Sequence, residues 1–366
     1  MKQSIVMVVL LALASPAQAQ LGRIGEALKK AQQAKEVKQK LDDLTFSEEE
    51  ERKLGEDVSL KIRQRFGVVQ DGGVHKYVAL AGTVLAQQSE RPKLPWTFVV
   101  LDTDGVNAFA SPGGFVHITR GALGLIANEA ELAAVLGHEI AHVTRKHTIN
   151  AIRKNNAIKL GSDQAGGRAA LIAAAANAVY DNIIENAYDR GDELDADKVS
   201  VELTQKAGYK PSTLGDFLNR LAERNNSQKE RNGLFASHPE TKERITKIGQ
   251  LAASAKAVAL VEARYKTNIK YRPTDISSIA KATEGSAGLA GSDGKKPEKK
   301  EEPKKGLGLG ALRKTVAPEK QTAQVSASGG ARGVGADRDA KGGSNPRPVQ
   351  VSVSASEVDA FKKGIA

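Results

Sequence analysis

Cysteine is absent from this 366-residue chain, and aromatic residues make up only 4% of it. Without cysteine the chain can form no disulfide and carry no lipid on a thiol, so a metal site must use histidine and carboxylate ligands. Beyond the N-terminus no segment reaches eighteen apolar residues, and the mature chain is expected to be soluble. The net charge of +11 comes without a basic patch interleaved with aromatic residues, so no nucleic acid is expected as a partner.

Residues 1–19 have the pattern of a secretory signal peptide. Lys2 precedes an apolar run over Ile5–Ala14, and Ala17-Gln18-Ala19 is a small-x-small cleavage site. We predict export to the periplasm and cleavage after Ala19; a membrane anchor is the alternative, but the apolar run is short for a span. Residues 20–44 are typical of a basic amphipathic leader helix, which could contact an anionic membrane surface or only be exposed to solvent.

Composition divides the rest of the chain into three parts. Residues 45–282 carry apolar residues at helix and strand spacing and form the predicted catalytic domain. Residues 283–348 are rich in glycine, serine, proline and lysine and are predicted to be a disordered linker. Residues 349–366 are predicted to be a short ordered segment, with an alternating strand and then a small helix that contains Phe361. This segment could dock on the domain or on a partner.

The pattern over 45–282 predicts an α+β fold that is mostly helical and has a small β-sheet. A strand is expected over 96–104, and two extended runs over 106–121 flank Pro112-Gly113-Gly114 as a hairpin. Residues 150–180 are expected to form a loop that leads into a helix. Further helices are expected from Ser47 to about 66, over 74–88, from Asn128, over 183–207, and after Pro211 and Pro239.

The stretch LAAVLGHEIAHVTRKH at 132–147 places His138 and His142 four residues apart around Glu139. Four residues of α-helix turn by about 400°, so both imidazoles lie on one face and can bind one zinc ion. Glu139 lies about 100° around the helix, close enough to take a proton from a zinc-bound water. His147 lies about 180° from His138 on an ideal helix, so we interpret it as a polar helix-end residue and not as a ligand.

A third ligand must come from another segment, because the metzincin pattern of a later glycine and histidine on the same helix is not present. The segment DRGDELDADKVSVEL at 189–203 places Glu193 and Asp197 four apart on one helix face. Glu193 could complete the zinc site, and Asp197 could accept the free ring N–H of a ligand histidine. Asp189 and Asp192 compete for these roles, and an acidic helix face is often only solvated charge.

These motifs, together with NAFASPGGFVHITRG at 107–121, closely resemble the HtpX/CAAX-prenyl-protease family of gluzincin zinc metallopeptidases, and its exported bacterial members most. The resemblance covers about residues 45–255 and implies a zincin-like domain with an active-site edge strand and one Zn2+ per chain. It implies the zinc ligands His138, His142 and Glu193, the general base Glu139, and Asp197 as the partner of a ligand histidine. It also implies that substrate backbone binds along the edge strand, at Asn107, Ala108, Phe109 and Ala110.

The segment FASHPETKERI at 235–245 matches the His-Pro segment of that family and makes His238 a candidate catalytic residue. His238 could donate a hydrogen bond to the oxyanion, or it could occupy the open coordination position and keep the enzyme latent. The alternative is a histidine that only precedes Pro239 at a helix start. Arg244 could support this site, whereas His75 and His117 have no such context and receive no role.

The sequence therefore predicts a zinc-dependent metalloendopeptidase of the bacterial cell envelope, in which Glu139 is the general base for a zinc-activated water. The resemblance implies misfolded or stalled envelope proteins as substrates. Polypeptides, outer-membrane assembly components and the membrane surface are the expected partners. The alternative is a zinc-containing periplasmic chaperone or assembly factor with latent or no proteolytic activity, and a further hypothesis is an interaction protein that acts through its basic ends.

Overall fold

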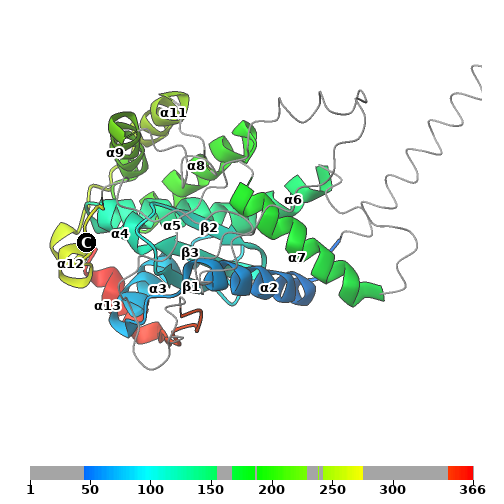
Figure 1. Ribbon diagram of the computed structural model, residues 1–366. Helices are drawn as coiled ribbons and strands as arrows, with labels where there is room; N and C mark the ends of the chain where they lie inside the picture. Colours follow the sequence, from blue (N-terminus) through cyan, green and yellow to red (C-terminus); the bar gives the residue numbers. More distant parts are fainter. Residues whose placement is uncertain are drawn as a thin grey trace, which may run out of the picture. The chain divides into compact units, whose positions relative to one another are not determined.

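The computed structural model describes residues 45–154, 167–185, 188–228, 238, 242–274 and 345–365. The chain divides into the units Met1–Ser47 and Glu48–Ala366, and the second unit carries all the elements described below (Figure 1). The predicted signal peptide, the predicted leader helix and the predicted linker up to residue 344 lie outside the described residues. None of the helices in the described part of the chain has both the length and the apolar character that a membrane span needs.

A three-stranded mixed sheet forms the β part of the second unit, with β3 between β1 and β2. β1 (Thr97–Leu101) runs parallel to β3 (Phe115–Thr119), and β2 (Ala108–Ser111) runs antiparallel to β3. The strand predicted over 96–104 and the hairpin predicted over 106–121 are both present. β2 lies at one edge of the sheet, where the family resemblance implied an edge strand.

The turn of this hairpin depends on glycine. Pro112–Gly114 form one 3-10 turn, η1, in which Gly113 has a φ of 70°. A Cβ atom on Gly113 would lie 2.6 Å from the Cα of Arg52 in α2 (Glu48–Phe66), so a side chain is excluded there. The N–H of Gly113 donates to Glu51 Oε1 at 3.1 Å, and Arg52 donates to the carbonyl of Gly113 at 2.9 Å. α2 therefore fixes the turn.

Helices cover both faces of the sheet. On one face α2 packs, where Ser59 Oγ bonds to His117 Nε2 at 2.8 Å and the ring of Phe66 stacks on Phe109. On the other face α3 (Gly72–Ala86) and α5 (Glu129–Thr144) pack. The strand residues that join the main core on this second face are Phe98, Val100, Ala108, Val116 and Ile118. Burial of both faces explains the nearly continuous apolar strands.

All sixteen residues of α5 are buried. The predicted cap is present, because the side chain of Asn128 accepts a hydrogen bond from the Glu131 N–H at 3.0 Å. α8 (Arg190–Lys206) packs along α5, and Ser200 Oγ donates to the carbonyl of Ala134 at 2.6 Å between the two helices. This close packing brings the acidic face of α8 onto the histidine face of α5.

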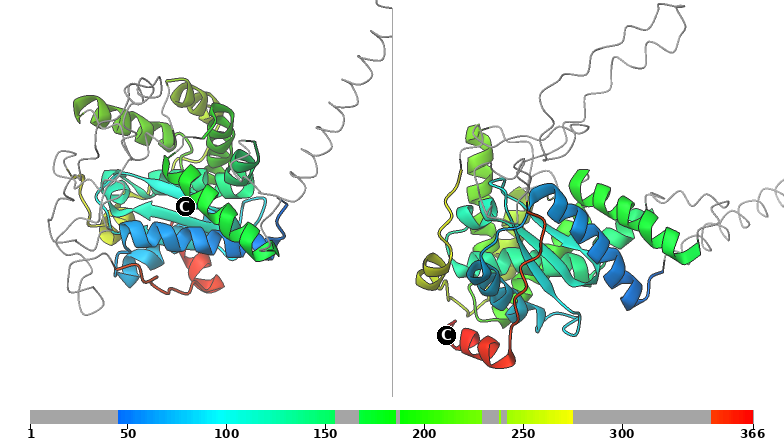
Figure 2. Two further views of the ribbon diagram at one scale, coloured as in Figure 1. Left: turned by 45° about the vertical axis from the view of Figure 1, so that its right-hand side comes forward. Right: turned by 60° about the horizontal axis from the view of Figure 1, so that its bottom comes forward.

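Further helices surround this pair (Figures 1 and 2). They are α4 (Arg120–Leu125), α6 (His147–Lys154), α7 (Gly167–Glu185), α9 (Thr213–Gln228), α11 (Lys242–Ala252), α12 (Glu262–Asn268) and α13 (Ala355–Lys363). The prediction of one helix over 183–207 is wrong, because residues 183–185 end α7 and α8 begins after the exposed N-cap residue Asp189. α7 packs on α2 and α6 and contacts β2 (Figure 2).

The last described segment, drawn in red in Figures 1 and 2, lies against α3, which Figure 1 labels. The N–H of Val68 donates to the carbonyl of Asn345 at 2.7 Å, and Lys76 pairs with Glu357 at 2.9 Å. Phe361 is buried in the main core. Residues 349–353 form no strand, so the strand predicted at the start of 349–366 is wrong. Pro348–Val351 and Val353 line a cavity of about 370 Å3 with α3 and β1, and α13 follows them.

Candidate metal centre

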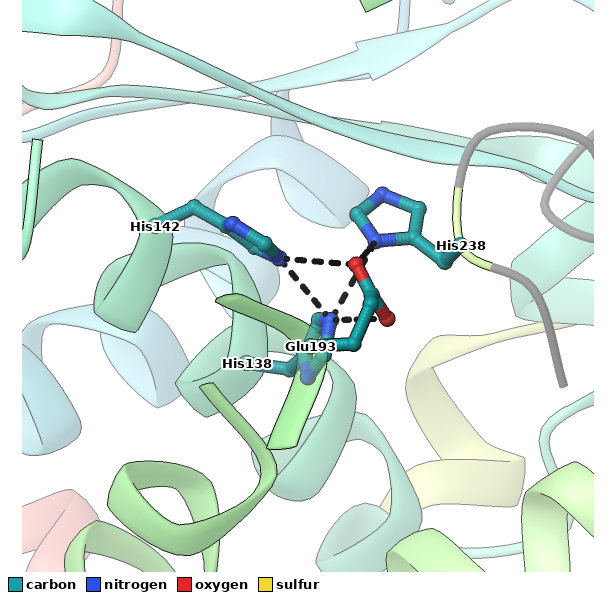
Figure 3. Close-up of side chains that lie close together, drawn as sticks. All are labelled: His138, His142, Glu193 and His238. Carbon is teal, nitrogen blue, oxygen red and sulfur yellow. Dashed lines mark hydrogen bonds and ion pairs between the residues drawn. The ribbon is translucent and has the colours of Figure 1, made fainter. Parts of the chain in front are cut away.

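Four buried side chains meet between α5, α8 and the segment before α11 (Figure 3). His138 and His142 lie one turn apart on α5, and Glu193 lies in the first turn of α8. His238 comes from the chain between α9 and α11. One ligand atom from each of the four residues lies within 4.8 Å of the others. We call these residues the donor group.

The separations within the donor group fit one tetrahedral ion. His142 Nε2 lies 3.0 Å from His138 Nε2 and 3.4 Å from Glu193 Oε1. His238 Nδ1 lies 3.2 Å from His138 Nε2 and 2.9 Å from Glu193 Oε1. Ligands at about 2.1 Å from a zinc ion in tetrahedral geometry are about 3.4 Å apart. Imidazole and carboxylate are also the ligands that zinc prefers, so the donor group fits a zinc ion.

Arg244 and Asp197 lie behind the donor group. Arg244 on α11 donates to both carboxylate oxygens of Asp197, at 2.7 and 2.6 Å, and pairs with Glu193 Oε2 at 2.6 Å. Asp197 Oδ1 lies 3.1 Å from His138 Nδ1, the ring nitrogen that faces away from the other donors. The structure therefore brings both residues to the positions in which the sequence predicted supporting roles.

The carboxylates favour a positive charge at this centre. Burial lowers the pKa of His138, but Glu193 and Asp197 outweigh burial and raise it to about 9. Burial raises the pKa of Glu193, but His238 and His138 hold it well below its usual range. A positive charge beside Glu193 and Asp197 is also what a bound metal ion would supply.

Glu139 lies beside the donor group and is fully buried. Neither of its carboxylate oxygens makes a hydrogen bond to a residue that the structure describes, and its Oε1 lies 3.6 Å from His238 Nε2. Burial raises the pKa of Glu139, and the nearby His238 and His138 only partly offset this. A buried carboxylate to which no described residue donates is suited to a water or a ligand as its partner.

The residues predicted to bind substrate lie on or next to β2. Ala108, Phe109 and Ala110 are buried, and Asn107 is partly buried. α2, α5 and α7 all contact this strand. The structure thus places the strand at the sheet edge but covers it. Closer to the donor group, a small hollow is lined by Val135, Leu214, Phe217 and Leu218 together with His138, Glu139, His238 and Arg244.

Two residues without a predicted role contact His142. Nδ1 of His147 lies 3.0 Å from Nδ1 of His142, and the ring of Tyr188 stacks on His142 with centroids 3.9 Å apart. The ideal-helix argument about His147 fails because α5 ends at Thr144 and Lys146 has a φ of 55°. The chain reverses there without the glycine that usually marks such a position, so the sequence carried no clear signal.

Residues 74–252 match the model of peptidase family M48, and this range contains the whole donor group. The chain contains a peptidase family M48 domain. The chain is similar to the beta-barrel assembly-enhancing protease of Yersinia pestis, at 25% identity over an alignment of 218 residues that covers 55% of this chain and 44% of that protein. It is also similar to metalloprotease YcaL of Escherichia coli (strain K12), at 29% identity over 166 residues, 44% of this chain and 64% of that protein.

The M48 domain confirms the predicted family and the mostly helical α+β fold. Peptidases of this family are zinc-dependent, so the domain is that of a metalloendopeptidase. The chain spans less than half the length of the assembly-enhancing protease that it matches. The bound metal, the role of each residue, the activity of the whole protein and its substrates stay predictions.

Proposed function

We propose that this protein is a zinc-dependent metalloendopeptidase of the bacterial cell envelope that hydrolyses peptide bonds in misfolded or stalled envelope proteins. The observation that carries the proposal is the buried set of His138, His142 and Glu193 beside Glu139, which has no hydrogen-bond donor among the described residues. The M48 domain and the names of its relatives support the same function.

His138, His142 and Glu193 would hold one zinc ion per chain. Bound there, zinc would lower the pKa of a water molecule toward 7 and polarise the carbonyl of the peptide bond to be cleaved. Asp197 would keep Nε2 of His138 directed at the metal by accepting the Nδ1–H. Arg244 would hold Glu193 and Asp197 in place through its ion pairs with both carboxylates.

Glu139 would take the proton from the attacking water and deliver it to the leaving amine. A general base works best when its pKa lies near the pH of the reaction, and burial raises the pKa of Glu139 in that direction. Because no described residue bonds to its carboxylate, the group is free to bind the water. The adjacent position of Glu139 and His138 on α5 keeps base and metal ligand in fixed relation.

The substrate would bind as an additional strand along β2, at Asn107–Ala110. Backbone pairing at a sheet edge selects extended, unfolded polypeptide and depends little on sequence. β2 is buried, and α7 is among the helices that contact it. A substrate strand on this edge would therefore lie close to α7.

A second candidate function rests on His238. Its Nδ1 belongs to the donor group and its Nε2 lies 3.6 Å from Glu139, so it stands between metal ligands and base. A zinc ion with four protein ligands is typical of structural sites, whereas catalytic sites keep one position open. With His238 bound the protein would be a latent peptidase or an assembly factor. With His238 released, its ring could donate to the oxyanion.

The decisive experiment compares the full chain with the variants Glu139→Gln and His238→Ala and with the control Glu202→Gln, an exposed glutamate on α8. Zinc content is measured by mass spectrometry, and cleavage is measured on β-casein as an unfolded substrate. We expect one zinc ion per chain in all four proteins and loss of cleavage only in Glu139→Gln. Cleavage by Glu139→Gln at the wild-type rate would contradict the proposed mechanism.

The same comparison separates the two candidate functions. An inactive wild type with an active His238→Ala variant would establish a latent peptidase that this histidine keeps closed. Bound zinc without cleavage by any of the proteins would favour the chaperone or assembly factor.

The proposed location and substrates need separate tests. N-terminal sequencing of the protein from a periplasmic fraction is expected to begin at Gln20. A purified outer-membrane β-barrel protein is offered in its unfolded form and in its folded form in detergent, and only the unfolded form should be cleaved. Equal cleavage of both forms would contradict the proposed preference for misfolded or stalled proteins.

A further inference from the structure

His142 has one ring nitrogen inside the donor group and one outside it. Its Nε2 faces His138 and Glu193 at 3.0 and 3.4 Å (Figure 3). Its Nδ1 faces Nδ1 of His147 at 3.0 Å, and the side chain of His147 is buried. The outer nitrogen of this ring is therefore hydrogen-bonded within the protein and not to bulk solvent.

The two histidines of α5 are supported in parallel ways. His138 has Asp197 at 3.1 Å from its outer Nδ1, and His142 has His147 at the same position of its ring. A histidine that binds a metal through Nε2 carries its proton on Nδ1, and a fixed acceptor there holds the ring in the ligating orientation. Asp197 comes from α8, whereas the acceptor for His142 is the first residue of α6.

The hydrogen-bond pattern determines the tautomer of His147. Only one proton fits between the two Nδ1 atoms, and metal binding through Nε2 assigns it to His142. Nδ1 of His147 is then the acceptor, and its own proton lies on Nε2. That nitrogen faces two carboxylates of α8, Asp192 Oδ1 at 3.8 Å and Asp195 Oδ2 at 3.5 Å. The carboxylates favour this tautomer because they attract the Nε2–H.

His142 has a second contact, on the face of its ring. The ring of Tyr188 stacks on the His142 ring at an angle of 25°, and the Tyr188 hydroxyl bonds to Thr148 Oγ1 at 2.8 Å. Thr148 directly follows His147, so the first turn of α6 contacts His142 on its outer nitrogen and also anchors the aromatic ring on its face. Rotation of His142 away from the donor group would break both contacts.

We propose that His147 is a positioning residue for the metal ligand His142, as the hydrogen-bond acceptor that fixes its tautomer and ring orientation. The inference rests on the zinc site of the proposed function. It adds that α6, which contributes no metal ligand, is part of the machinery that binds the metal.

The test measures zinc affinity by competition with a chromogenic chelator for the full chain and three variants. His147→Leu removes the acceptor, His147→Asn keeps an acceptor oxygen near the position of Nδ1, and His75→Leu is the control. His75 is also buried and bonds through Nε2 to the carbonyl of Val69 at 2.9 Å, outside the metal centre. We expect His147→Leu to bind zinc about 10 to 100 times more weakly. His147→Asn should stay within about threefold of wild type, and His75→Leu should not change zinc affinity.

Each result has one meaning. If the wild type binds no zinc, the proposed function fails. If the wild type binds zinc and His147→Leu binds it equally tightly, the zinc site stands and the role of His147 is wrong. A fall in the melting temperature of the metal-free variant, without a change in zinc affinity, would show that His147 is only structural.

A measurement on the unaltered protein covers the case in which His147→Leu does not fold. In the zinc-loaded wild type with 15N-labelled histidine, NMR should show the proton of His142 on Nδ1 and the proton of His147 on Nε2. A proton on Nδ1 of His147 would overturn the proposal.

Discussion

The two ends of α5 each bury a glutamate, and the two glutamates differ in their partners. At the N-terminal end, Glu129 accepts hydrogen bonds from Tyr77 at 2.7 Å and from Tyr209 at 2.6 Å, and Arg264 donates to both of its oxygens. Nearer the C-terminal end, five residues before Thr144, Glu139 accepts none from any residue that the structure describes. Both side chains are fully buried.

The difference indicates that Glu129 stabilises the fold, whereas Glu139 is available for a reaction. A buried carboxylate costs folding free energy unless donors replace its water, and Glu129 has these donors. Glu139 has no such donor among the described residues, and its nearest charged neighbour is His238 Nε2 at 3.6 Å, so its carboxylate stays available to a substrate or a water. The pKa values agree with this view, because burial raises the pKa of Glu139, whereas burial and Glu129 together raise the pKa of Tyr77 and Tyr209 and keep both as neutral donors.

Glu139→Gln should give the largest effect on activity. Removal of a general base lowers turnover by about 10²- to 10⁴-fold. The same change removes an unsatisfied buried charge, so the free energy of unfolding of the metal-free protein should stay equal or rise. Peptidase assays and urea denaturation measure the two quantities, and a clear loss of stability would show that Glu139 has a structural partner after all.

Glu129→Gln should show the opposite behaviour. It leaves Arg264 and two buried hydroxyl groups without their charged acceptor, which should lower the free energy of unfolding by about 4 kcal/mol. The residual folded protein should bind zinc with unchanged affinity, because Glu129 lies outside the donor group. Weaker zinc binding by the folded variant would mean that Glu129 also supports the metal centre. That result would contradict the separation of roles between the two glutamates.

Phe361→Ala tests whether the stable end of α5 depends on the C-terminal segment. The ring of Phe361 lies 4.0 Å from the guanidinium of Arg264, and its carbonyl accepts from Arg264 Nη1 at 3.0 Å. Loss of the buried ring should cost about 3 kcal/mol of unfolding free energy. The control Phe361→Leu keeps most of the apolar volume and should recover more than half of this loss. Equal stability of all three proteins would show that the segment does not support Arg264.

Glu51→Gln should give the smallest effect on stability. Like Glu129, and unlike Glu139, Glu51 is a buried carboxylate with hydrogen-bond partners in the described part of the protein. Burial raises its pKa, but hydrogen bonds from Arg91 and Lys146 outweigh this and hold the pKa below its ordinary value of 4.5. Its ionised form therefore stabilises the fold above about pH 4.5, and this contribution is lost as the pH falls through the folded-state pKa. Urea denaturation of the metal-free protein from pH 6 to pH 3 should show wild type and Glu51→Gln converging; a constant difference would contradict this.

The local parts of the site were predictable because they depend on helix geometry. The spacing of His138, Glu139 and His142 and the cap at Asn128 require only a helix of known start. The pair Glu193 and Asp197 shares a face for the same reason. Which of the acidic residues would reach the histidines depends on how α8 packs on α5, and only the resemblance pointed to one choice.

The remaining parts depend on chain reversals and long-range contacts that leave little trace in the sequence. Lys146 adopts a positive φ without a glycine, and this places His147 beside His142. Residues 349–353 alternate as a strand would, but their neighbours are side chains of α3 and its preceding loop. Lys76 donates to the carbonyl of Ser352, and just before this stretch Gln70 donates to the carbonyl of Arg347. An apolar-polar alternation with a period of two predicts which side chains of an extended segment face the protein. It does not predict whether the segment pairs with a strand or packs on a helix.

The docking of the C-terminal segment also determines when the M48 domain can be complete. Arg63 donates to the carbonyl of Pro346 at 2.8 Å, across 283 positions of the chain. Because Pro346 is synthesised 283 positions after Arg63, this contact can form only after synthesis has passed residue 346. Until then Arg264, which pairs with Glu129 at the start of α5, lacks its contacts with Phe361. A nascent chain therefore carries the residues of a peptidase before it has the finished fold of one.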